Sequence, residues 1–290
     1  MASIESALRL SKTSLAINVA LAGIKIAAGV FGNSYVLIAD GIESVADIFT
    51  SFVVWSGLRV ANLPADANHP YGHGKAESIA SAVVSLSLLG AAVIIAAQSV
   101  REIASPQGPP HKYTLLVLVA VIIIKEVLFR RVLRTGTSLD SGALRADAWH
   151  HRSDALTSAA AFVGILIALV GGKGFEAADD WAALVACGIV AWNGVRLLRS
   201  TLDDIMDAAV SPEIVAAVRE LAGSVDGVVE IEKCRVRKLG LHFALDIHVV
   251  VNGDLSVRRG HAIAHEVEAK LRSSQHRIND VTVHIEPDQP

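Results

Sequence analysis

Six apolar stretches follow one another through the first two thirds of the chain, and each has flanks that are compatible with a helix. Several of these stretches are shorter than the roughly 20 residues that one membrane span needs, but the flanks supply the missing turns. The fourth stretch contains Lys125 and Glu126 in its interior. The pattern predicts an all-α bundle of six transmembrane helices. The apolar stretches lie near residues 15–31, 35–58, 79–100, 115–129, 155–170 and 184–198.

The pattern changes after about residue 203, and no later apolar run is long enough to cross a bilayer. Ser211 and Pro212 can open a helix, Gly240 separates two segments of alternating polarity, and Ser256 can cap a second helix. The order helix, strand, strand, helix, strand (αββαβ) predicts a small α+β open-faced sandwich. Its core alone would be marginal, so we expect it to pack against a second copy. The predicted division is residues 1–206 for the transmembrane domain and 207–290 for the soluble domain, with elements at 211–225, 228–239, 241–251, 256–271 and 280–287.

The composition is that of a membrane protein rather than a soluble enzyme, with 52% hydrophobic residues, 19% charged residues and a mean hydropathy of +0.47. The formal net charge is -3 and no long basic run is present, so we expect no nucleic-acid partner. Cys187 and Cys234 cannot form a disulfide framework or a thiolate zinc site by themselves. Any bound metal ion must therefore have oxygen and nitrogen ligands.

The loops on the two sides of the predicted spans differ in their content of Lys and Arg. An even number of spans places both termini on one side, and positive residues concentrate on the cytoplasmic side. Three positive residues lie on the other side, Arg101, Lys112 and Lys173. We therefore expect a multi-pass protein of the cell (inner) membrane with both termini in the cytoplasm. The ten residues on the side of the termini are Arg9, Lys12, Arg59, Lys75, Arg130, Arg131, Arg134, Arg145, Arg196 and Arg199.

Ionisable residues recur at helical spacing inside the second and fifth predicted spans. In each span, three of them follow one another at intervals of three and four and so lie along one face of a helix. An ionisable group in the hydrocarbon core is unfavourable, so it is normally paired, exposed to a water cavity or functional. The residues are Asp40, Glu43 and Asp47 in the second span, and Asp147, His150 and Asp154 in the fifth span, just before its apolar stretch. His151 points roughly 100° away from His150.

Two helices that each present two ligands one turn apart can complete a tetrahedral metal shell. The four residues that would form this shell are Glu43, Asp47, His150 and Asp154. In the alternative interpretation, the same groups lie at interfacial depth or form buried ion pairs with Lys25, Lys125 or Arg152. This alternative is favoured for Asp40 and Asp147, which lie one turn nearer the helix ends.

Further potential metal ligands lie outside the predicted spans. Asp66, His69 and His73 follow one another closely in the loop between the second and third spans, where they can bind an ion or be merely solvated. The soluble domain has several histidines and acids on different predicted elements, which can likewise form a site or be ordinary surface residues. These are Glu232, His248, His261, His265, His284 and Glu286.

Three sequence segments resemble those of a known family: ADGIESVAD in the second span, NHPYGHGKAES in the loop and ALRADAWHHRSD in the fifth span. On these segments the chain resembles the cation diffusion facilitator family over essentially its full length, and bacterial iron and zinc efflux members in particular. The resemblance implies a homodimer without enzymatic activity. It also implies exchange of a divalent ion such as Zn²⁺, Fe²⁺ or Mn²⁺ for protons by alternating access, with no cofactor beyond the transported ion.

The resemblance also implies roles for individual residues. The transport site falls on Glu43, Asp47, His150 and Asp154. The second, loop site falls on Asp66, His69 and His73. The cytoplasmic cluster, which bridges two protomers, draws on Glu232, His248, His261, His284 and Glu286. Lys75 and Asp207 match a charge pair that fastens the transmembrane part to the cytoplasmic domain.

Departures from the family pattern affect the expected metal preference. Glu43 stands where this branch has Asp or His, and its extra methylene moves the carboxylate by about one bond length. Glu232 and Glu286 replace a histidine and an aspartate, so we expect a weaker or differently occupied cytoplasmic site. A metal-responsive membrane scaffold without net transport would use the same ligands and is the alternative function. An intramembrane metallohydrolase is disfavoured, because the chain has no HExxH-type motif.

Overall fold

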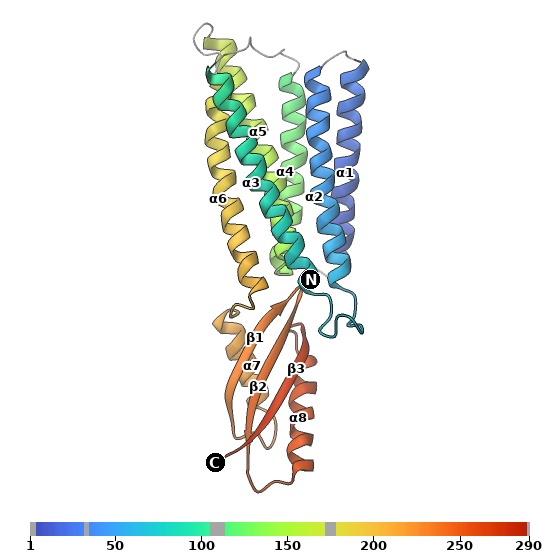
Figure 1. Ribbon diagram of the computed structural model, residues 1–290, viewed down its shortest axis with the longest axis vertical. Helices are drawn as coiled ribbons and strands as arrows, with labels where there is room; N and C mark the ends of the chain where they lie inside the picture. The colour runs from blue at the N-terminus through green and yellow to red at the C-terminus, as the bar shows by residue number, and fades with distance from the viewer. Residues whose placement is uncertain (1–3, 32–34, 105–113, 172–177, 289–290) are drawn as a thin grey trace. The chain divides into compact units, whose positions relative to one another are not determined.

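The computed structural model of the protein describes residues 4–31, 35–104, 114–171 and 178–288 (Figure 1). Within these ranges, the side chains of some residues, among them Lys25, Asp40 and Glu43, lie outside the described set. The chain forms two compact units, Met1–Leu202 and Asp203–Pro290.

The first unit consists of long helices that run roughly along one another (Figure 1). By length and hydropathy alone, α3 and α6 are the two helices among the described residues that could cross a membrane, with mean hydropathies of 2.4 and 1.5. α4 is one continuous helix, which Lys125 and Glu126 do not interrupt. The helices are α1 Ile4–Phe31, α2 Tyr35–Ala61, α3 Lys75–Ala104, α4 Thr114–Ser138, α5 Gly142–Gly171 and α6 Ala178–Ile205.

The helices of the first unit pack in pairs. α1 packs along α2, and α4 packs along α5, whereas α2 and α5 touch each other over only a short stretch. α3 contacts both α2 and α5. At Gly57 of α2, an added Cβ would lie 2.4 Å from the Cβ of Ala80 on α3. Small residues permit such close approach of backbones, as is common between membrane helices.

Gly57→Ala is expected to destabilise the bundle, although alanine is the better helix former by about 0.5–1 kcal/mol. The new methyl group would also lie 3.2 Å from the carbonyl oxygen of Ala76, so α2 and α3 must separate. Gly90→Ala is the matched control, because nothing lies within 4 Å of a Cβ added there. Thermal unfolding should show a Tm lower by roughly 3–8 °C for Gly57→Ala and an unchanged or higher Tm for Gly90→Ala. Equal Tm values for the two variants would contradict this prediction.

The start of α5 is held by a carboxylate from α3. Oε1 of Glu77 accepts hydrogen bonds from Oγ of Ser141, at 2.7 Å, and from the backbone N–H of Ala143, at 2.8 Å. Ser141 Oγ in turn accepts from the backbone N–H of Leu144, at 3.2 Å. Glu77 and Ser141 are both 0% exposed. Backbone donors at a helix start have no partner within the helix, and these two side chains supply the missing acceptors.

The second unit is a three-stranded sheet packed against two helices (Figure 1). The strand order is β1-β2-β3, in which β1 pairs with β2 antiparallel and β2 pairs with β3 parallel. α8 makes the crossover between the two parallel strands. The elements are α7 Pro212–Gly223, β1 Glu230–Leu239, β2 His242–Val251, α8 Val257–Arg272 and β3 Ile278–Pro287.

The core of the second unit lies between the sheet and the helices. Ile263, Val267 and Leu271 recur every four residues along α8 and are all 0% exposed, as expected for one apolar helix face. Ser256 Oγ caps α8 by accepting from the backbone N–H of Arg259, at 3.3 Å. Ser211 stands at the predicted N-cap of α7, but its side chain makes no capping hydrogen bond with the backbone. Pro212 at the first position removes one of the donors that such a cap would serve.

Candidate metal centres

Three of the four predicted transport-site residues come together inside the helix bundle. Asp47 of α2 and His150 and Asp154 of α5 each offer a ligand atom, and these atoms all lie within 4.8 Å of one another. Nε2 of His150 is 3.0 Å from Oδ1 of Asp47. The His150 side chain is 8% exposed, that of Asp47 16% and that of Asp154 24%. Two carboxylates and an imidazole in one enclosed group form a donor set that suits a divalent transition metal.

The fourth predicted ligand, Glu43, lies on α2 one helical turn before Asp47, but its side chain lies outside the described residues. The same holds for Asp40, one turn earlier, and for Lys25 of α1. Helical spacing alone therefore places Glu43 on the face that carries Asp47.

A lysine from α4 enters the same group. Nζ of Lys125 lies 2.6 Å from Oδ2 of Asp47 and 2.8 Å from Oδ2 of Asp154, and the residue is 3% exposed. Of Lys125 and Arg152, the two candidate cations whose side chains are described, Lys125 thus forms the buried ion pairs with the ligand group. Arg152 instead pairs with Glu126 of α4 and stacks over the ring of Phe129.

A second buried polar group lies beside the first. His151 leaves α5 on a different side from His150, and its Nε2 is 2.7 Å from Oγ of Ser14 on α1. Oδ2 of Asp147 is 3.8 Å from the same nitrogen, and all three side chains are 0% exposed. Ser14 and Asn18 were not predicted as site residues. The signal that could have found them is a pair of polar residues four apart at the start of the first span.

The loop between α2 and α3 brings Asp66, His69 and His73 together, with one ligand atom of each within 4.8 Å of the others. Nδ1 of His69 is 3.2 Å from Oδ1 of Asp66, and Nε2 of His73 is 3.3 Å from Oδ2. Nδ1 of His73 donates to the carbonyl of Pro64, at 3.1 Å, which leaves Nε2 as the nitrogen that a metal ion could use. The backbone N–H groups of His69 and Asn68 donate to Asp66 and hold the pKa of its carboxyl below the usual value.

The third cluster lies on the sheet of the second unit. His248 of β2 and His284 of β3 are register partners, and with Glu286 they place their ligand atoms within 4.8 Å of one another. Nδ1 of His248 is 2.6 Å from Oε1 of Glu286 and 3.7 Å from Oε2 of Glu232 on β1. Side-chain hydrogen bonding shared with Glu232 is the largest influence that lowers the pKa of Glu286 below its usual value, and hydrogen bonding with His248 is the second. Because residues two apart on a strand share a face, His284 and Glu286 point the same way.

His261, predicted as a member of the cytoplasmic cluster, is not part of this sheet group of three. It lies on the exposed side of α8, where its Nε2 is 3.1 Å from Nε2 of His265, one turn later. Helical spacing of four residues brings these two rings together. The cytoplasmic ligands predicted from the sequence are therefore divided between the sheet and α8.

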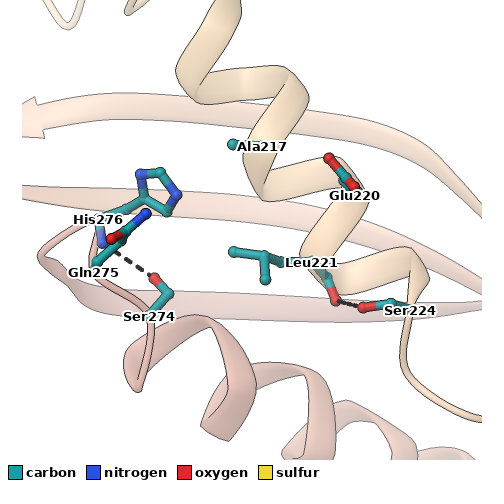
Figure 2. A pocket seen from close by; sticks show the side chains of 7 residues that line it. All are labelled: Ala217, Glu220, Leu221, Ser224, Ser274, Gln275 and His276. Carbon is teal, nitrogen blue, oxygen red and sulfur yellow. Dashed lines mark hydrogen bonds between the residues drawn. The ribbon is translucent and has the colours of Figure 1, made fainter.

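A hollow in the second unit lies beside α7 and the turn that follows α8 (Figure 2). The hydrogen bonds among its lining residues join residues that are close in the sequence. Ser224 Oγ donates to the carbonyl of Leu221, and the backbone N–H of His276 donates to Ser274 Oγ. None of the predicted metal ligands lines it. The lining residues are Ala217, Glu220, Leu221, Ser224, Ser274, Gln275 and His276.

Lys75 and Asp207, the predicted charge pair, belong to different units of the chain. Lys75 is the first residue of α3. Asp207 has a positive φ of 56°, and its Oδ2 lies 3.4 Å from Nη1 of Arg237 on β1. The pairing of Lys75 with Asp207 stays a prediction.

Comparison with known families decides the identity of the chain. Residues 11–206 match the cation efflux transmembrane domain, and residues 210–288 match the cation efflux protein cytoplasmic domain. The chain belongs to the cation diffusion facilitator family. A cation diffusion facilitator is a transporter rather than an enzyme, and its transmembrane domain makes it a protein of the cell membrane.

Relatives of this cation diffusion facilitator extend over most of its length. It is 30% identical over 274 residues to the manganese efflux system protein MneP of Bacillus subtilis, with 93% of this chain and 92% of that protein covered. It is 32% identical over 315 residues to metal tolerance protein 2 of Oryza sativa subsp. japonica, with 99% and 80% covered. The solved structure of MamM-CTD is 27% identical, with 27% of this chain and 99% of that one covered and a TM-score of 0.26.

Proposed function

We propose that this protein exports divalent transition-metal ions such as Zn²⁺, Fe²⁺ or Mn²⁺ across the cytoplasmic membrane in exchange for protons. The observation that carries the proposal is the enclosed group of Asp47, His150 and Asp154, contributed by two helices of the bundle. Ionisable residues at such positions are unfavourable unless they serve an ion pathway or a binding site. MneP, a relative over nearly the whole chain, is named as a manganese efflux protein, which supports export as the direction.

In the proposed arrangement, α1 to α6 all cross the membrane and both termini lie in the cytoplasm. The excess of Lys and Arg on the side of the termini supports this orientation. Two copies associate through the second unit, whose small core favours packing against another surface. Lys75 and Asp207 form the charge pair that fastens the two units together.

The proposed cycle starts with a hydrated ion that enters from the cytoplasm, loses water and binds to Asp47, His150 and Asp154, with Glu43 as fourth ligand. Metal and protons compete for these groups, because ligands must be deprotonated to bind. Protons that arrive from the outer side would expel the metal there. Affinity alone would favour Zn²⁺ over Fe²⁺ and Mn²⁺, so geometry and availability must set the selectivity.

The two clusters outside the bundle are proposed as additional metal sites. The loop group of Asp66, His69 and His73 has the imidazole and carboxylate donors of a three-ligand site. The sheet group would use His248, His284 and Glu286 with Glu232 nearby, while His261 would contribute from α8.

Metal uptake into inverted membrane vesicles tests the proposed function. Vesicles that contain the protein should accumulate Zn²⁺, Fe²⁺, Mn²⁺ or Co²⁺ when their interior is acidic, because protons leave as the metal enters. Vesicles without the protein are the control. Uptake that persists unchanged after the pH gradient is collapsed would contradict proton exchange. Absence of uptake for all four ions, together with metal binding, would favour the scaffold function instead.

A further inference from the structure

A lysine side chain lies where the candidate transport site would hold its cation. Nζ of Lys125 is 2.6 Å from a carboxylate oxygen of Asp47 and 2.8 Å from one of Asp154. The three residues come from α4, α2 and α5, so the ammonium group connects the two helices that carry the ligands. Two of the oxygens that a metal ion would need are thereby engaged. An ammonium group and a metal ion cannot both bind these oxygens at close range.

Buried carboxylates need compensating positive charge whenever the metal ion is absent. The two oxygens of Asp47 contact different groups: Nε2 of His150 lies 3.0 Å from Oδ1, and Nζ of Lys125 contacts Oδ2. A divalent ion brings two positive charges, whereas a lysine brings one charge on a flexible stem of four carbons. The lysine therefore compensates part of the negative charge and is a weaker competitor than the metal ion.

We propose that Lys125 is a tethered counter-cation of the transport site. Its ammonium group lies between Asp47 and Asp154 while the carrier is empty, and the divalent ion displaces it on binding. This inference rests on the proposed function, because it assigns a role at the same site. Since each binding event must break two ion pairs, Lys125 lowers the affinity for metal and assists release when the ammonium group returns.

Asn18 of α1 offers the displaced ammonium group another acceptor. Oδ1 of Asn18 is 3.3 Å from Nζ of Lys125. Nδ2 of Asn18 donates to Oγ of Ser51 on α2, at 2.9 Å, which fixes the orientation of the amide. Both Asn18 and Ser51 are buried. The amine can therefore leave the carboxylates and keep one hydrogen bond inside the bundle.

Equilibrium Zn²⁺ binding to the full-length protein tests the proposal. The background is His73→Ala/His248→Ala, which removes one ligand from the loop cluster and one from the sheet cluster. In this background, Lys125→Gln should bind Zn²⁺ about tenfold or more tightly, because no ammonium group opposes the metal. Lys125→Arg keeps the charge and should bind no more tightly than the background. Lys12→Gln, on an exposed position of α1, is the control and should leave the Kd unchanged.

An unchanged or higher Kd in folded Lys125→Gln would overturn the proposal. If Lys125→Gln does not fold, the rate at which an amine-directed reagent modifies Lys125 in the wild-type protein tests the proposal instead. Lys125 should then be modified several-fold faster in the presence of Zn²⁺ than in its absence, and an equal or slower rate overturns the proposal.

Asp154→Asn in the same background separates the two proposals. If Zn²⁺ binding survives this change, the transport site itself is wrong. If Asp154→Asn abolishes binding while Lys125→Gln leaves the Kd unchanged, only the role of the lysine is wrong.

Discussion

Asp154→Asn is expected to reduce metal transport by about a hundredfold or more while the protein stays folded. The substitution keeps the shape of the side chain but removes the negative charge that a divalent ion needs. Lys125 keeps its contact with Asp47, at 2.6 Å, so no buried ammonium group is left without a counter-charge. Initial rates of Zn²⁺, Fe²⁺, Mn²⁺ and Co²⁺ uptake in inverted vesicles provide the measurement.

Three further variants complete this experiment. Glu5→Gln changes an exposed acid on α1, whose side chain is 73% exposed, and should transport at the wild-type rate. Asp47→Ala/Asp154→Ala removes both carboxylates and should abolish uptake of all four ions. Because this variant leaves Lys125 unpaired, Lys125→Met is added to restore the charge balance. Uptake of the four metals at the wild-type rate in the double or triple variant would show that the transport site is wrongly assigned.

Glu77→Ala is expected to have the largest effect on stability, about 2–4 kcal/mol. The change removes the acceptor of two buried hydrogen bonds, from Ser141 Oγ and from the backbone N–H of Ala143. The start of α5 would then have unsatisfied donors inside the bundle. Thermal unfolding of the purified protein should show a Tm lower by roughly 5–15 °C.

Glu77→Gln should be milder than Glu77→Ala, because the amide oxygen can still accept both hydrogen bonds. Glu102→Ala, near the other end of α3, is the matched control. Glu102 accepts a hydrogen bond from Gln98 at an exposed position, so its loss should change the Tm little. Similar Tm values for Glu77→Ala and Glu102→Ala would show that the capping contact contributes nothing.

Helical spacing was enough to predict which side chains of α2 and α5 share a face. Asp47 on one helix and His150 with Asp154 on the other follow from local geometry, because residues three and four apart are neighbours on any helix. The choice of Lys125 as their partner could not be made in this way. It depends on α4 packing along α5, from where the Lys125 side chain also reaches Asp47 of α2. The sequence alone left Lys25, Lys125 and Arg152 as alternatives.

Contacts between residues distant in the sequence escaped prediction for the same reason. Glu77 lies inside the loop segment that carried the family resemblance, yet its partners Ser141 and Ala143 lie at the start of α5, far away in the sequence. His261 was assigned to the cytoplasmic cluster by resemblance, and this assignment stays a prediction. The structure places its ring beside that of His265 on α8. That pairing had a local signal, two histidines four residues apart.

The contacts of α3 hold the two ligand-bearing helices, α2 and α5, close to a common point in the bundle. Gly57 against Ala80 and Glu77 against Ala143 hold α2 and α5 to the first turns of α3. Asp47 and Asp154 lie about ten residues further along their helices, roughly 15 Å away at 1.5 Å per residue. Over this distance, a tilt of either helix by about 5° about its contact with α3 moves its carboxylate by about 1.3 Å. Because α2 and α5 touch only briefly, such a tilt can open or close the ligand group with little loss of apolar packing.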